Sequence, residues 1–330
     1  MKHILNKLFS YQSLDKAEAS EILTQLASGA YNNSQIAAFM TVFLMRNITV
    51  DELTGFRDAM LELCVKVPAQ DYNAIDLCGT GGDGKDTFNI STLASFVVAG
   101  AGYMVAKHGN YGVSSVCGSS NVLEYVGCRF TNDIGQIMKS FDQSNFAFMH
   151  APLFHPAMKN VAPIRKELGV KTFFNMLGPM VNPAFPANQM VGVFNLELAR
   201  LYGYLYQNTD KNFLIIHALD GYDEVSLTGD FKYISKEEEA IGSPDLLGLP
   251  YLKASSLAGG KDIEASAKLF IDVLDNKGTD AQNHAVVANA GLGIATIKSI
   301  PFERGVYEAR ESLLSGRAKA TFTKFLRLNS

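Results

Sequence analysis

The sequence predicts an α/β protein, in which a small all-α N-terminal domain precedes a mostly parallel sheet flanked by helices. Two observations support this fold class. The first 68 residues carry only helical signals, whereas from Asn73 onward short apolar runs typical of strands alternate with segments of helical periodicity. That alternation is typical of βα units, whose connecting helices cover the faces of a parallel sheet.

The N-terminal 68 residues contain a well-marked helix start at Thr49–Glu52. This segment is a capping box, in which threonine and glutamate side chains each bond the other residue's backbone N–H, and apolar residues follow at helical spacing. Gln35–Met45 is apolar around more of its circumference than one core-facing stripe needs. It is either buried within its own domain or shared with a second subunit. Pro68 disfavours helix in the preceding residue, so we place the domain boundary there, between 1–68 and 69–330.

The α/β part contains five predicted strands with helices between them. The strands are Ala74–Cys78, Tyr103–Ala106, Phe146–His150, Met190–Phe194 and Phe213–Ala218, and intervening helices include Leu93–Ala99, Ile134–Phe141 and Leu196–Tyr206. A helical tail, Glu303–Leu328, looks structural. In such folds ligands bind in loops at the carboxyl ends of the strands.

Composition and charge exclude several classes of partner. The net charge is −4, from 33 acidic and 29 basic residues, with no basic tail, which argues against nucleic acid and anionic membranes. No apolar run reaches the ~18 residues that span a bilayer, and the first residues lack an apolar core suited to export. The four cysteines form no CxxC pair. We therefore expect a cytoplasmic enzyme with reduced thiols.

Three loops rich in small residues follow predicted strands and indicate a phosphate site: Gly79–Asp86, Lys107–Ser115 and Gly118–Asn121. Between Lys85 and Arg129 the only firmly cationic side chain is Lys107. An anion bound there must be held mostly by backbone N–H groups, helix N-termini and hydroxyls, together with a metal cation. These loops predict a site for a heavily phosphorylated small molecule.

Two familiar phosphate motifs overlap the first loop. Gly79–Gly84 has the dinucleotide-binding spacing, but no acidic residue lies between Asp86 and Glu124 to hold the ribose hydroxyls. The same loop has the spacing of a nucleotide P-loop, but Asp86 stands where a hydroxyl should contact Mg²⁺. The dinucleotide interpretation fails, the P-loop interpretation is weak, and a glycine-rich turn without a ligand is the remaining alternative.

Motifs along nearly the whole chain resemble those of the anthranilate phosphoribosyltransferases. They are Gly79-Thr80-Gly81-Gly82-Asp83, Asn89-Ile90-Ser91-Thr92, Lys107-His108-Gly109-Asn110, Gly118-Ser119, His155-Pro156-Ala157-Met158-Lys159-Asn160, Arg165 with Leu168-Gly169, Phe174-Asn175-Met176-Leu177-Gly178-Pro179, Asp223-Glu224 and Ser315-Gly316-Arg317-Ala318. The resemblance implies a nucleoside phosphorylase/phosphoribosyltransferase-like fold. It also implies transfer of the phosphoribosyl group from 5-phosphoribosyl 1-pyrophosphate to the amine of anthranilate, in tryptophan biosynthesis.

The resemblance also implies roles for individual residues. Phosphoribosyl pyrophosphate is expected at Gly79, Gly82, Asp83, Thr87, Asn89, Ile90, Ser91, Thr92, Lys107, His108, Gly109, Asn110, Tyr111, Gly112, Val113, Ser114, Ser115 and Ser119. Anthranilate is expected at Gly79, Asn110 and Arg165, and Mg²⁺, two ions per subunit, at Ser91, Asp223 and Glu224. No residue is assigned as general base. A homodimer through the N-terminal helices, with the site in the cleft between the domains, completes the expectation.

Plainer interpretations stand beside these roles. Ser91 and Thr92 lie where a helix N-cap is expected and could be simple caps, Arg165 could be a surface residue, and adjacent acids on a loop are usually just solvated. The chain also departs from the family pattern at Tyr111-Gly112, where an arginine and a small residue are common. Further departures are Ser120-Asn121 in place of Ala-Asp, and Lys171 in place of arginine.

Three other functions remain as alternatives. A pyrimidine nucleoside phosphorylase-like enzyme would need pyrimidine-reading groups at Arg165 and Asn110. A non-catalytic nucleic-acid-binding relative of the fold should be basic and should lack the acidic pair, and this chain has neither property. A P-loop nucleotidase would need the hydroxyl that residue 86 lacks.

Overall fold

The computed structural model describes residues 1–112 and 115–330, which form two compact units. The helical unit comprises Met1–Lys66 and Ala151–Pro183, and the sheet unit comprises Val67–His150 and Ala184–Ser330. The first join falls close to the predicted boundary at residue 68. The units differ from the predicted domains in residues 151–183, which were expected in the α/β domain and pack with the helical unit instead.

The helical unit is built from short helices, some of which begin with capping boxes. Its helices are α1 (Lys2–Phe9), α2 (Lys16–Ala27), α3 (Asn33–Met45), α4 (Val50–Glu62), α8 (Ala151–Phe154), α9 (Ala162–Leu168) and α10 (Phe174–Leu177), with 3-10 turns at Pro156–Asn160 and Gly178–Met180. The predicted capping box before α4 is confirmed, because Thr49 Oγ1 accepts from Glu52 N at 3.2 Å. Capping boxes also begin α2 and α3. These caps satisfy backbone donors that a helix start otherwise leaves unpaired.

An aromatic cluster explains why residues 151–183 join the helical unit. The Phe173 ring stacks on Phe56 at 4.5 Å between centroids and meets the edges of Phe43 at 5.1 Å and Phe39 at 6.0 Å. Phe39, Phe56 and Phe173 are at most 1% exposed. Asn160 adds a hydrogen bond from its amide to the carbonyl of Ala27, at 2.7 Å. Burial of these rings favours packing of the second segment on the first.

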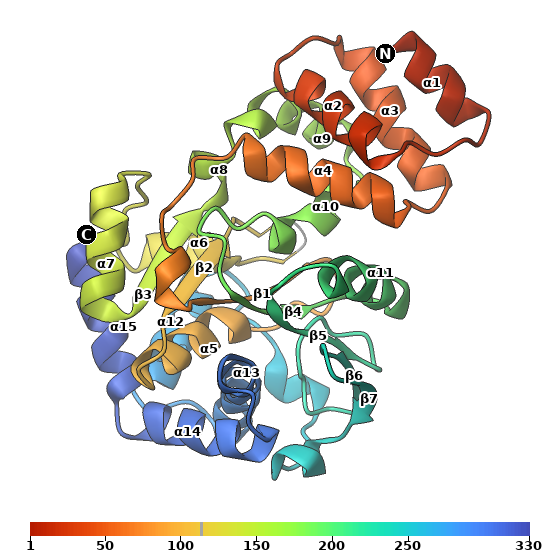
Figure 1. The fold of residues 1–330 in the computed structure, drawn as a ribbon. Helices are drawn as coiled ribbons and strands as arrows, with labels where there is room; N and C mark the ends of the chain where they lie inside the picture. Colours follow the sequence, from red (N-terminus) through yellow and green to blue (C-terminus); the bar gives the residue numbers. More distant parts are fainter. Residues whose placement is uncertain (113–114) are drawn as a thin grey trace. The chain divides into compact units, whose positions relative to one another are not determined.

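The sheet unit contains a seven-stranded sheet in the order β3-β2-β1-β4-β5-β6-β7 (Figure 1). The strands are β1 (Ile75–Gly79), β2 (Val105–Gly109), β3 (Phe146–His150), β4 (Asn188–Gly192), β5 (Asn212–Ala218), β6 (Phe231–Ile234) and β7 (Glu239–Gly242). The first five pair in parallel and the last two are antiparallel. The mostly parallel sheet and its five predicted strands are therefore confirmed, with shifts of about two residues at β2 and β4 (predicted as Tyr103–Ala106 and Met190–Phe194).

Helices flank this sheet, as predicted. They are α5 (Ile90–Gly100), α6 (Ser119–Tyr125), α7 (Ile134–Ser144), α11 (Leu196–Gln207), α12 (Ile263–Leu274), α13 (Asp280–Lys298), α14 (Phe302–Leu314) and α15 (Arg317–Leu328), with 3-10 turns at Gln70–Tyr72, Pro244–Leu247 and Ala254–Leu257. The core helix α13 packs against both α5 and α14 (Figure 1). In the described part of the chain no single helix is long and apolar enough to cross a membrane. Helices α13 and α14 reach that length and apolar composition only together, and they are bent relative to each other.

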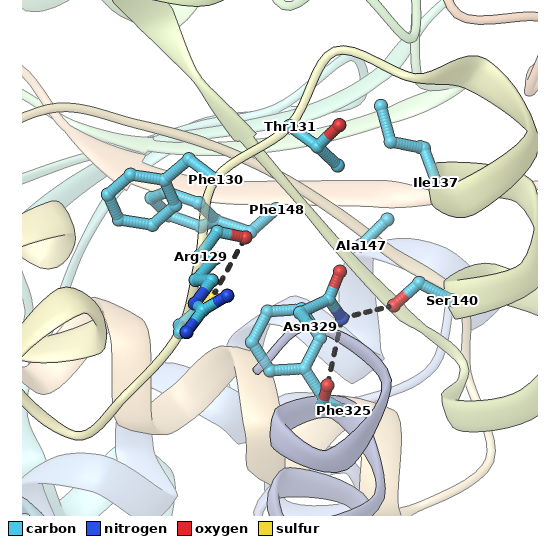
Figure 2. A pocket seen from close by; sticks show the side chains of 10 residues that line it. Arg129, Phe130, Thr131, Ile137, Ser140, Ala147, Phe148, Phe325 and Asn329 are labelled. Atoms are coloured by element: carbon cyan, nitrogen blue, oxygen red, sulfur yellow. Dashed lines mark hydrogen bonds between the residues drawn. The ribbon is translucent and has the colours of Figure 1, made fainter.

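The C-terminal helix is fastened to the sheet unit by its last turn. The Asn329 side chain donates to Ser140 Oγ at 3.2 Å and to the Phe325 carbonyl at 2.8 Å (Figure 2). The Arg129 N–H donates to the Asn329 carbonyl at 2.6 Å. The Phe325 ring meets the edge of Phe146 on β3, with centroids 4.8 Å apart. These contacts confirm the structural role predicted for the helical tail.

Candidate functional site

The loop after β1 has a backbone that glycine makes possible. Gly81, Gly82 and Gly84 have φ angles of +66°, +81° and +73°, in the left-handed region that other residues rarely adopt. The loop is tied to its surroundings by the Thr80 N–H, which donates to the Gly192 carbonyl at 2.9 Å, and by the Gly81 N–H, which donates to Asp223 Oδ2 at 2.6 Å. The predicted glycine-rich loop is thus a defined structure held by one of the two predicted acids.

Two further glycines let the segment around Asp223 cross the ends of two strands. A Cβ at Gly79, the last residue of β1, would lie 2.3 Å from Asp223 Oδ2. A Cβ at Gly192, the last residue of β4, would lie 1.5 Å from the Asp223 carbonyl oxygen. Side chains at either strand end would therefore displace the acidic residue.

We expect Gly192→Ala to destabilise the protein by about 3 kcal/mol or more, because the new methyl group overlaps backbone that must then move. Gly203→Ala is the matched control, since its Cβ would meet the nearest side-chain atom at 3.6 Å, an ordinary contact. Gly203 lies inside α11, where alanine is favoured over glycine by roughly 0.5–1 kcal/mol. Urea unfolding of both variants measures the two effects. Equal stabilities would contradict the close approach.

Water reaches the two acids to different extents, because Asp223 is half-buried and Glu224 is buried. Glu224 is 9% exposed, and in the described residues its Oε1 has no hydrogen-bond partner. Burial, with the charge of Asp83 as the next cause, raises the pKa of Asp223 to about 7. Burial also raises the pKa of Glu224 well above its usual range, helped by the Asp223 charge and opposed by a hydrogen bond from Thr87. Glu224 is therefore not an ordinary solvated acid.

These carboxylates fit a divalent cation. Oxygen atoms of Asp and Glu are preferred Mg²⁺ ligands, and a cation beside them would offset the burial and the neighbouring negative charges that raise their pKa values. The unpartnered Oε1 of Glu224 is an acceptor that such an ion would satisfy. Across residues 1–112 and 115–330 no cluster of three or more His, Cys, Asp or Glu side chains forms a ready-made metal cage. Mg²⁺ commonly takes its remaining ligands from substrate phosphates and water.

The N-terminus of α5 presents uncapped backbone donors. Its N-cap residue is Asn89, whose side chain makes no capping hydrogen bond and instead donates to the Cys117 carbonyl at 2.9 Å. Ser91 and Thr92, predicted at the N-cap, lie in the first turn, with Thr92 buried. Asn89 therefore holds the neighbouring loop. The Ile90 N–H donates to the Phe88 carbonyl at 2.6 Å, and among the described residues the next two N–H groups of α5, those of Ser91 and Thr92, are available to an anion.

Lys107 differs from an exposed phosphate-binding lysine. It is 2% exposed, and its Nζ donates to the Leu77 carbonyl at 2.6 Å and to Ser91 Oγ at 3.5 Å. Burial lowers the pKa of Lys107, and the charge of buried Asp76 opposes that change. In this structure the ammonium group ties β1 and β2 to Ser91, a predicted metal ligand.

The second small-residue loop is closed by an amide that the sequence did not single out as functional. Asn121 Oδ1 accepts from the N–H groups of both Gly112 and Gly118, at 2.9 and 3.0 Å. The Asn110 carbonyl accepts from Ser120 N at 3.1 Å and from the Ser119 hydroxyl at 3.3 Å. This network draws the two ends of the loop together. The predicted residues Val113 and Ser114 lie outside the described residues.

The structure shows what Tyr111, a departure from the family pattern, contacts. Its ring meets the edge of His150 at 4.9 Å between centroids, and its hydroxyl donates to Glu124 at 3.2 Å. His150 Nδ1 is 2.8 Å from Ser120 Oγ, and the His150 ring stacks on Phe130 with centroids 4.4 Å apart. The two family departures Tyr111 and Ser120 thus belong to one cluster. His150 was missed because nothing in its local sequence marks this contact.

Two other predicted residues of this region have backbone roles. The His108 N–H donates to Asp76 Oδ1 at 3.3 Å. At Gly109, the last residue of β2, a Cβ would lie 2.4 Å from Ser119 Oγ, so glycine allows the two loops to meet.

Arg165 lies on α9 in the helical unit without an acidic partner among the residues described. Its Nη2 donates to Asn175 Oδ1 at 3.3 Å, and the guanidinium lies 5.2 Å from the centre of the Phe174 ring. Burial lowers its pKa. An arginine held by a neutral amide and an aromatic face, with no carboxylate paired to it, is suited to receive a carboxylate ligand. Gly79 and Asn110, the other predicted anthranilate residues, belong to the sheet unit.

Comparison with known proteins places both units in one family. Residues 71–319 match the model of the glycosyl transferase family, a/b domain, and residues 2–64 match the helical bundle domain of that family. The chain is 59% identical over 329 residues to the anthranilate phosphoribosyltransferase of Christiangramia forsetii, covering 100% of this chain and 99% of that protein. It is 52% identical over 331 residues to that of Bacteroides thetaiotaomicron, covering 100% of both.

Solved structures agree with this assignment. Anthranilate phosphoribosyltransferase from Thermus thermophilus superposes with a TM-score of 0.92 at 31% identity, over 98% of both chains. The enzyme from Saccharomyces cerevisiae, in complex with phosphoribosyl pyrophosphate and magnesium, superposes with a TM-score of 0.90 at 25% identity, over 98% of this chain and 96% of that one. The chain belongs to the anthranilate phosphoribosyltransferases of the glycosyl transferase family.

Proposed function

We propose that the chain transfers the 5-phosphoribosyl group of phosphoribosyl pyrophosphate to the amine of anthranilate, giving N-(5-phosphoribosyl)anthranilate and pyrophosphate. The observation that carries this proposal is the adjacent acids Asp223, which accepts from the Gly81 N–H of the glycine-rich loop, and Glu224, which is buried. Adjacent carboxylates, one of them buried, are suited to bind a cation that carries a diphosphate. The family relatives, including one solved with phosphoribosyl pyrophosphate and magnesium, support the same reaction.

The chain's own residues would bind and orient the leaving diphosphate. The Asp83–Gly84 part of the glycine-rich loop and the first turn of α5 would offer backbone N–H groups to phosphate oxygens. Donors placed where negative charge develops lower the barrier to departure of the diphosphate. Asp223, Glu224 and Ser91 would hold Mg²⁺. When bound, Mg²⁺ neutralises the charge that gathers on the leaving group.

Arg165 would orient the acceptor. Its guanidinium can bind anthranilate's carboxylate through two parallel hydrogen bonds, and Asn110 and Gly79 complete the proposed acceptor contacts. We assign no general base, since an aromatic amine is largely unprotonated at neutral pH. Alignment of the amine with the ribose C1 can then suffice, with the proton lost after bond formation.

Several finer features are part of the proposal. We infer two Mg²⁺ ions per subunit, a cytoplasmic location and a homodimer through the N-terminal helices. The dimer is supported by large apolar side chains that the described helical unit leaves exposed, among them Phe9 at 58%, Leu44 at 45% and Met45 at 82%. Sedimentation velocity tests the dimer. A single species of monomer mass at micromolar concentration would contradict it.

Loss of anthranilate fluorescence tests the reaction itself. We expect the fluorescence to fall when phosphoribosyl pyrophosphate and Mg²⁺ are added with the protein, and to stay constant when either is omitted. The same preparation with uridine and inorganic phosphate should release no uracil, which separates this activity from nucleoside phosphorolysis. Constant fluorescence with folded protein would contradict the proposed function.

A further inference from the structure

Asn289, on the core helix α13, contacts the backbone directly after the acidic pair. Its Oδ1 accepts from the Val225 N–H at 3.0 Å, and its Nδ2 donates to the Val225 carbonyl at 2.9 Å. The same Nδ2 donates to the Ala285 carbonyl at 2.8 Å, one turn earlier on α13. Asn289 is 2% exposed. One buried side chain therefore pairs both polar groups of the residue that follows Glu224.

The Asn289 side chain bonds the Val225 backbone as a neighbouring β-strand would. Val225 lies in the segment between β5 and β6, and among the described residues both recorded backbone hydrogen bonds of Val225 go to Asn289. Every α13 residue from Ala285 to Ala295 is buried, and Asn289 is the polar side chain within that run. An amide in an apolar helix is unfavourable unless it is fully hydrogen-bonded, and this one is.

The acidic segment is thus fixed on two sides. Asp223 is held by the Gly81 N–H and closely approached by Gly79 and Gly192. Val225 is held by Asn289. Glu224 lies between these two fixed residues, so the placement of its carboxylate depends on both.

We propose that Asn289 is a positioning residue for the metal-binding step, acting through Val225 on Glu224 and Asp223. This inference rests on the proposed function, because it assigns Asn289 to the site at which the cation and diphosphate would bind. Residues that orient metal ligands without touching the metal typically change metal affinity by about 10–100-fold when they are replaced. Asn289 does this from a helix separated from the ligands by more than sixty residues of sequence.

Asn289→Ala tests the inference, with Asn188→Ala as the matched control. Asn188 is also fully buried and donates to the carbonyls of Asn73 and Ala74 at 3.1 and 3.2 Å. It begins β4, at the end opposite Gly192, where Asp223 lies. Both variants lose buried hydrogen bonds of a side-chain amide, so both should melt at lower temperature than the unmodified protein.

The deciding measurement is Mn²⁺ binding in the presence of inorganic pyrophosphate, followed by electron paramagnetic resonance. We expect Asn289→Ala to weaken Mn²⁺ binding by about tenfold or more and Asn188→Ala to leave it unchanged. Asn289→Ser, which keeps one hydrogen-bonding group, should give an intermediate affinity and serves if the alanine variant does not fold. Unchanged Mn²⁺ affinity in the folded Asn289 variants would overturn the inference and leave the proposed function intact. Absence of Mn²⁺ binding by the unmodified protein would overturn both.

Discussion

Glu224→Gln is expected to lower kcat on the order of 100-fold, about 2.7 kcal/mol, and to raise the Mg²⁺ concentration for half-maximal rate. The pKa of Glu224 is raised by burial and by the Asp223 charge, so a neutral amide relieves repulsion in the ligand-free protein. The melting temperature without ligands should therefore stay constant or rise. Asp223→Asn should act alike, since an amide oxygen can still accept from the Gly81 N–H. Mg²⁺ titrations and thermal melts measure both effects.

Asp230→Asn is the control for this prediction. Asp230 is an exposed acid of the same connecting segment, and it accepts a hydrogen bond from the Tyr251 hydroxyl at 3.0 Å. The Mg²⁺ dependence of the Asp230→Asn variant should match that of the unmodified protein. A Glu224→Gln protein with lower melting temperature and an unaltered Mg²⁺ response would show that the acidic pair is structural.

Arg165→Ala is expected to raise the KM for anthranilate by about 10–150-fold, because a charged hydrogen-bonded contact contributes about 1.5–3 kcal/mol. The KM for phosphoribosyl pyrophosphate should change far less. Arg165→Lys should also raise the KM for anthranilate, since an ammonium group cannot form the two parallel bonds of a guanidinium. Steady-state kinetics with each substrate varied in turn separates the two constants.

Lys166→Ala is the matched control, because Lys166 is an exposed cation next to Arg165 on α9. Its kinetic constants should stay close to those of the unmodified protein. If Arg165→Ala raised both KM values equally, the arginine would be a support of the fold and the proposed acceptor site would be wrong.

Local patterns predicted the parallel part of the sheet because its strands are buried on both faces and read as continuous apolar runs. They did not predict β6 and β7, four-residue antiparallel strands in a segment rich in charge, such as Lys232 and Glu239. They also did not predict that residues 151–183 pack with the helical unit. The contacts of Phe173 with Phe39 and Phe56 join residues more than a hundred positions apart, and periodicity carries no information about them.

In the candidate site, too, some features could be predicted from the local sequence and others could not. Its glycine-rich loops and acidic pair were predictable from residue types and order. Their supports were not predictable, because each is a single side-chain amide that nothing in the local pattern marks. Asn89 bonds Cys117 and Asn289 bonds Val225 from distant parts of the sequence, and Asn121 bonds two N–H groups of its own loop region. Nor could composition predict that the cation Lys107 is buried against the Leu77 carbonyl.

The most direct test of the account is the stoichiometry of the reaction. Anthranilate loss and pyrophosphate release should be measured together in one mixture of the protein, both substrates and Mg²⁺. We expect the two amounts to be equal throughout, and pyrophosphate release to stop when anthranilate is left out. Pyrophosphate release that continues without anthranilate, or anthranilate that persists beside folded protein, would contradict phosphoribosyl transfer to this acceptor.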